Sequence, residues 1–130
     1  MIMISETCGK GKHVVEVTVH DTDGWGLVVF VRGGEKPHLG GVALASPGGK
    51  AHGQKLSSCD LWTITVPGHK DAELAQKIAK KICKASGEPV SVSLGIHVEQ
   101  AEAKDIELIC MNADAAVTAF LQKYLNKKIQ

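Results

Sequence analysis

Three of the six histidines stand where the chain is expected to change direction, and imidazole at such positions can bind ligands or metals. His38 lies in a glycine-rich segment, residues 32–47, and His69 and His97 each follow a glycine by one or two positions. Glycines let backbone N–H groups approach a ligand that a side chain would block. We therefore predict a binding site in which these three histidines can hold a divalent metal.

Residues beside the histidines suit a phosphate group. The N-terminus of a helix carries unpaired N–H groups and a partial positive charge, and the helix predicted from Asp71 begins next to His69. A glycine-rich turn with solvated side chains, and Asp71 acting only as a helix cap, remain alternative interpretations. The candidate residues for an anionic cofactor are Lys36, His38, Gly40, Gly41, His69, Lys70 and His97.

A carboxylate accompanies one of the histidines. His97 and Glu99 lie two positions apart, so they point to the same side of a strand, where the carboxylate can orient the ring. The sequence contains no nucleophile elbow, no phosphate-binding loop ending in Gly-Lys-Ser or Gly-Lys-Thr, and no His-Glu-x-x-His helix. We therefore expect a protein that is not an enzyme.

Composition narrows the class of partner. The 130 residues carry a formal net charge of +1 and 4% aromatic residues, so neither charge nor stacking favours nucleic acid. No apolar stretch approaches the roughly 20 residues of a membrane span, and the apolar start is too short for a signal peptide. We expect one cytoplasmic domain over residues 1–130, without a membrane partner. No Cys-x-x-Cys pair occurs among Cys8, Cys59, Cys83 and Cys110, so a tetracysteine metal site has no local support. In the cytoplasm the four cysteines are expected as reduced thiols.

Alternating apolar and polar residues predict a strand over residues 12–20, and apolar runs predict strands over residues 25–32 and 42–45. A fourth strand is predicted over residues 59–66. Turn residues at 21–24 predict an antiparallel hairpin between the first two strands. We expect the next two to continue a meander, with residues 32–47 as a hairpin tip and residues 46–58 as a long loop. His13 and His20 are expected on the exposed face of the first strand.

Helical spacing replaces alternation near residue 71. It predicts one helix that ends before Gly87 and a second over residues 104–128, whose pattern allows a break near Asn112, with a strand over residues 90–98 between them. The predicted fold class is α+β, a mainly antiparallel sheet of about five to six strands with two helices packed on one face. The expected buried stripe of the second helix is Ile106, Ile109, Cys110, Ala113, Ala116, Val117, Phe120, Leu121 and Tyr124.

The motifs around the three histidines resemble those of a known family. They are residues 33–43, 67–71 and 95–98, in this order and at this spacing. From residue 12 to residue 124 the chain is similar to the small prenylated-flavin chaperones, the D-type accessory proteins of hydroxyarylic acid decarboxylases. The domain of that family is similar to proteasome assembly chaperones.

This resemblance implies a non-enzymatic homodimer that binds prenylated FMN or FMN. It would receive the cofactor from a flavin prenyltransferase and pass it to a prenylated-flavin-dependent decarboxylase. Backbone donors at the glycines and at the helix start would hold the phosphate, and a divalent cation on the histidines would bridge to it. The isoalloxazine needs an apolar slot, for which the candidates are Trp25, Phe30 and Trp62.

Two other functions remain open. One is an assembly chaperone that binds protein through a sheet edge or the helices, with the glycine segments serving only as turns. The other is a small metal-dependent hydrolase or lyase that uses His38, His69 and His97, with Glu99 as base. A bound flavin would exclude the first, and metal retention that depends on His69 and His97 would test the second.

Overall fold

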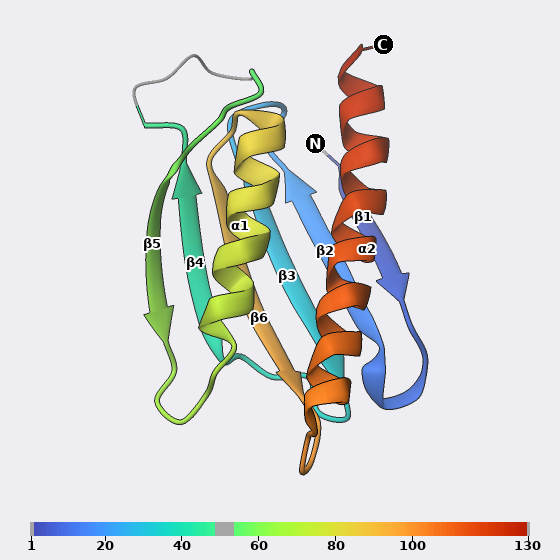
Figure 1. Ribbon diagram of the computed structural model, residues 1–130. Coiled ribbons are helices and arrows are strands. Elements are labelled where there is room, and N and C mark those ends of the chain that lie inside the picture. Colours follow the sequence, from blue (N-terminus) through green and yellow to red (C-terminus); the bar gives the residue numbers. More distant parts are fainter. Residues whose placement is uncertain (1, 49–53, 130) are drawn as a thin grey trace.

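A six-stranded sheet carries two α-helices on one face in the computed structural model, which describes residues 2–48 and 54–129 (Figure 1). This arrangement confirms the predicted α+β class. Helix α1 packs on β4 and β6, and α2 packs on β1 and β2. The elements are β1 (Met3–Cys8), the 3-10 helix η1 (Gly11–His13), β2 (Val15–Asp21), β3 (Leu27–Gly34), β4 (Gly41–Ser46), β5 (Asp60–Thr65), α1 (Ala72–Ser86), β6 (Val90–His97) and α2 (Ala103–Ile129).

In the part of the chain that the structure describes, the strand order is β1-β2-β3-β6-β4-β5, and only the β3–β6 pair is parallel. The predicted β2–β3 hairpin is confirmed. The predicted meander is wrong, because β6 lies between β3 and β4. Strand β6 reaches that place through the β5–α1–β6 crossover, which carries the chain over β4. Residues 32–47 therefore contain a connection that crosses β6 rather than a hairpin tip.

Side-chain alternation decides which sheet face is buried. Alternate residues of β2, β3 and β6 face the core, and they are aliphatic except for Asp21 and Gly33. Phe120 is the largest fully buried side chain of α2, and Ile78 and Ile82 of α1 lie in the same core. The predicted stripe of the second helix is confirmed except at Ile106, which is exposed, and Cys110, which is half-buried. Cys83 is buried.

Three local predictions need correction. Strand β1 is an addition to the predicted strands. It lies at the edge of the sheet, where its residues alternate between exposed and partly buried, so it lacks the fully buried apolar face of an inner strand. His13 lies in η1, where its ring bonds Asp105, rather than on a strand face; His20 is exposed as predicted. Helix α2 runs through Asn112 without a break, since that side chain donates to the His13 carbonyl oxygen instead of competing for helix bonds.

The loop predicted over residues 46–58 joins β4 to β5, and its residues 49–53 lie outside the described part of the chain. Within the described ranges, the helices include none whose length and apolar character would suit a bilayer crossing.

Candidate functional site

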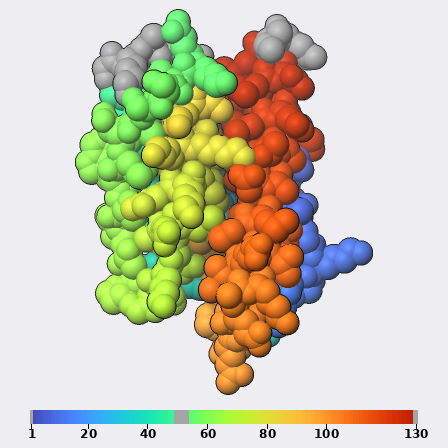
Figure 2. Space-filling view, in the orientation of Figure 1, coloured from blue at the N-terminus to red at the C-terminus, as the bar shows by residue number. Residues whose placement is uncertain are grey.

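A cavity of about 440 Å³ opens where β6 ends and both α-helices begin. Figure 2 shows the two helices side by side on this face, α1 in yellow-green and α2 in orange to red. The polar residues of the cavity lining, called the polar wall, are His38, His69, Lys70, Asp71, Glu73, Lys77 and His97. The apolar and mostly aliphatic residues of the lining, called the apolar or aliphatic wall, are Leu74, Ile96, Val98, Ala101, Ile106, Ile109 and Cys110.

His38 reaches this cavity because the β3–β4 connection crosses the end of β6. The crossing is held by backbone hydrogen bonds from Glu35 N to His97 O, 2.7 Å, and from Gly40 N to Leu94 O, 2.9 Å. A Cβ at Gly95 would overlap the His38 carbonyl oxygen. Because glycine has no side chain, the β3–β4 connection can lie directly against β6 at Gly95.

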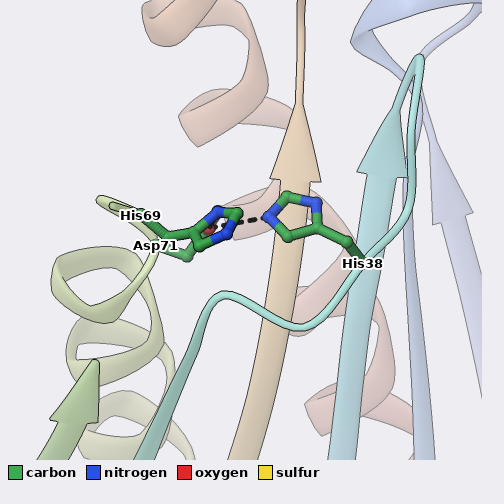
Figure 3. Close-up of side chains that lie close together, drawn as sticks. All are labelled: His38, His69 and Asp71. Carbon is green, nitrogen blue, oxygen red and sulfur yellow. Dashed lines mark hydrogen bonds and ion pairs between the residues drawn. The ribbon is translucent and has the colours of Figure 1, made fainter. Parts of the chain in front are cut away.

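Asp71 precedes α1, but its side chain forms no capping hydrogen bond. Its Oδ1 accepts the Ile96 N–H at 3.1 Å, which ties the helix start to β6. Its Oδ2 lies 3.1 Å from His38 Nε2 and 3.8 Å from His69 Nδ1 (Figure 3). The Asp71 side chain is about 10% exposed, so its contacts with the histidines are largely buried from water.

The structure brings two of the predicted histidines together and sets the third slightly apart. The ring centroids of His38 and His69 are 4.7 Å apart, whereas His97 is 6.1 Å from His38. His97 Nε2 instead lies 3.3 Å from Glu99 Oε1, which agrees with the expected pairing. The third member of the cluster is Asp71, for which the sequence pattern predicted only a role at the helix start.

Charges around Glu99 favour its ionised form. The hydrogen bond and charge of His97, followed by the ammonium of Lys36 at 3.5 Å, hold the pKa of the Glu99 carboxyl below its usual value. Glu99 is well exposed. Lys36 thus lies outside the cavity lining and pairs with a surface carboxylate.

The glycines proposed for phosphate binding make room for the helix start. Gly40 and Gly41 are buried, and neither lines the cavity. A Cβ at Gly40 would overlap the Asp71 carboxylate, and one at Gly41 would crowd the backbone of Ala72. Lys70, by contrast, is exposed and lines the cavity.

The aromatic residues proposed for an isoalloxazine slot lie elsewhere. Trp25, Phe30 and Trp62 are exposed, and none of them is part of the cavity lining. The apolar wall consists of aliphatic residues that helical spacing assigned to the core. Ile106 and Cys110 share the stripe of the core residues, so sequence periodicity could not separate a cavity wall from a filled core.

Comparison with family models assigns residues 9–125 to the prenylated flavin chaperone LpdD-like domain. The chain belongs to this family. Among solved structures, it is similar to a chain of a chaperone complex for yeast 20S proteasome assembly, with a TM-score of 0.53 and 15% sequence identity. That match covers 96% of this chain and 92% of the yeast chain, and it shows a shared fold. Comparison with curated proteins gives no match.

Proposed function

We propose that this member of the prenylated flavin chaperone family binds prenylated FMN, or FMN, in the cavity and delivers it to an apo-decarboxylase without catalysing a reaction itself. The observation that carries the proposal is the mixed lining of the cavity, which combines imidazole, ammonium and carboxylate groups with a set of mostly aliphatic side chains. Its volume is about 440 Å³. Sites for small ligands typically have volumes of about 300–1,000 Å³.

The polar wall suits the phosphate. The first turn of α1 directs backbone N–H groups toward this end, and Lys70 adds a positive charge at the rim. His69 supplies a further donor beside Lys70. We assign the phosphate to this wall and the ring system, with its prenyl addition, to the aliphatic wall.

The hydrolase or lyase alternative is weakened by the position of its base. Glu99 is exposed, and its lowered pKa makes the carboxylate a poorer proton acceptor. The assembly-chaperone alternative draws on the fold shared with the yeast chain, and at 15% identity that likeness concerns the fold alone. Neither alternative accounts for the family to which this chain belongs.

The partners that follow from this function are a flavin prenyltransferase, which supplies the cofactor, and a prenylated-flavin-dependent decarboxylase, which accepts it. We place all three in the cytoplasm. We also propose a homodimer, formed through the sheet face that the helices leave uncovered. Several large apolar side chains are exposed on this face: Val28, Phe30, Leu44, Trp62 and Ile64.

The test is cofactor retention in protein co-produced with a flavin prenyltransferase and purified without oxygen. Ile106→Trp places a large ring into the aliphatic wall from an exposed position, and Leu108→Trp is the matched control on an exposed part of the same helix, outside the cavity lining. We expect stoichiometric prenylated FMN, by absorbance and mass analysis, in the wild type and the control but not in Ile106→Trp.

Transfer is measured next, by adding loaded chaperone to apo-decarboxylase and following decarboxylation. A colourless wild-type protein that also ignores added reduced or oxidised flavin would contradict the carrier function and favour the assembly chaperone.

A further inference from the structure

Hydrogen bonding to the His38 ring determines which atom of the ring faces Asp71. His38 Nδ1 lies 3.0 Å from the carbonyl oxygen of Lys36. A carbonyl oxygen only accepts, so Nδ1 carries the proton and donates it. In the neutral ring the other nitrogen, Nε2, then presents a lone pair, and it faces a carboxylate oxygen of Asp71 at 3.1 Å. Two acceptors at this distance repel each other unless a cation lies between them or the ring is protonated.

A third donor completes a group suited to a metal ion. One ligand atom from each of His38, His69 and Asp71 lies within 4.8 Å of the others. Ligand atoms about 2.0–2.2 Å from a tetrahedral ion lie roughly 3–4 Å from one another. The distances from Asp71 Oδ2 to the two rings, 3.1 and 3.8 Å, fall in that range.

We propose that His38, His69 and Asp71 form a binding site for a divalent transition metal, with Zn²⁺ as the preferred ion. Two imidazole nitrogens and one carboxylate oxygen form a donor set that suits Zn²⁺ and related ions better than Mg²⁺ or Ca²⁺. The site differs from the three-histidine set expected from the sequence, since Asp71 takes the place of His97.

Groups around the ligands hold them in position. Lys36 O accepts from His38 Nδ1–H, the arrangement that directs the other ring nitrogen to a metal. The Ile96 N–H binds Asp71 Oδ1 and leaves Oδ2 directed at the rings. Gly40, where a Cβ would overlap the Asp71 carboxylate, keeps the space open. Outer contacts of this kind orient the ligands in metal sites.

All three side chains belong to the cavity lining, so a fourth position of the metal faces the ligand space. Three protein ligands with one open position allow an exchangeable oxygen to bind. We assign that position to an anionic oxygen, such as a phosphate oxygen of the bound cofactor. This assignment of the fourth ligand rests on the proposed carrier function, whereas the metal site itself does not.

The experiment measures metal binding in the absence of any flavin. Protein carrying a purification tag without histidine is stripped with chelator and titrated with Zn²⁺ by calorimetry, and with Co²⁺ by visible absorption. Asp71→Asn keeps an oxygen for the Ile96 N–H and removes the charge. His69→Ala is a second ligand variant at an exposed position. His97→Ala is the matched control, because it removes an imidazole from the same cavity and spares the cluster.

We expect one equivalent of each metal in the wild type and in His97→Ala. Both ligand variants should bind Zn²⁺ more weakly by more than about 100-fold, since loss of even an outer partner costs roughly 10–100-fold. A wild type that binds neither metal overturns the site and identifies the His38–Asp71 contact as an ion pair. Unchanged binding in the folded ligand variants overturns it as well. A protein that binds Zn²⁺ but no flavin supports the site and contradicts only the carrier function.

Discussion

Asp71 and Asp105 each stand at the start of a helix, and each carboxylate contacts a histidine from a distant segment. Asp71 meets His38 across 33 positions, and Asp105 meets His13 across 92. Asp105 Oδ2 also accepts the Glu102 N–H at 2.9 Å, as in a capping box. Single carboxylates therefore connect helix starts to segments that are remote in sequence.

We expect Asp105 to make stability depend on pH in the acid range. The hydrogen bond from His13, followed by the backbone N–H of Glu102, lowers the pKa of Asp105 from 3.8 to about 2. As pH falls, the Asp105 carboxylate is protonated in the unfolded chain before it is protonated in the folded protein. Its contribution to the free energy of unfolding is therefore complete above about pH 4 and is lost between about pH 4 and 2.

The measurement is urea unfolding of wild type and Asp105→Asn across this range. The difference in unfolding free energy should shrink steadily below about pH 4. Glu107→Gln, at an exposed position of the same helix, is the control. A difference between wild type and Asp105→Asn that stays constant with pH would exclude this role of Asp105.

At the scale of elements, the crossing of β6 by the β3–β4 connection positions the site. The parallel β3–β6 pair leaves β4 on the far side of β6, so the connection must pass the end of that strand. It does so at Gly95 and delivers His38 to the start of α1. The start of α1 is fixed from the other side by the Asp71–Ile96 hydrogen bond.

Gly95→Ala should displace this connection. The new Cβ would overlap the His38 carbonyl oxygen, and relief of such overpacking costs about 1–3 kcal/mol. We expect a lower midpoint in thermal or urea unfolding together with weaker cofactor binding. Ser93→Ala, on the same face of the same strand, should change both by much less. Equal effects of the two substitutions would show that the crossing at Gly95 is not constrained.

At the scale of the whole molecule, the two faces of the sheet differ. The helices cover one face. The other face is polar over β1 and β2 apart from Met3, and it is mostly apolar over β3, β4 and β5, with Ser91 and Ser93 of β6 between β3 and β4. An apolar area of this kind on one side of a sheet favours burial against a second surface. A second copy of the chain presents the same apolar area, which a twofold axis would bring face to face.

We expect the wild type to sediment as a dimer at micromolar concentration and Ile64→Glu to sediment as a monomer. Ile64 is 72% exposed, so the substitution should spare the fold while placing a charge in the proposed interface. Ser5→Glu, on the polar part of the same face, should remain dimeric. Analytical ultracentrifugation decides the matter. A monomeric wild type, or a dimeric Ile64→Glu, would rule out this interface.

Local patterns in the sequence were sufficient to predict most elements and the family. Alternation in residues 15–19 and helical spacing from residue 71 depend on neighbours along the chain, so they can be read without the fold. The turn at residues 21–24 predicted the β2–β3 hairpin for the same reason. The motifs around the three histidines predicted the family that the comparison then assigned.

Tertiary structure alone decided the strand order and the composition of the site. Insertion of β6 between β3 and β4 depends on pairing between distant segments, which local periodicity does not encode. Asp71 joins the histidines because its carboxylate bonds Ile96 of β6 instead of capping α1. Ile106 and Cys110 continue an apolar stripe in sequence, but only the packing of the two helices leaves a cavity beside them.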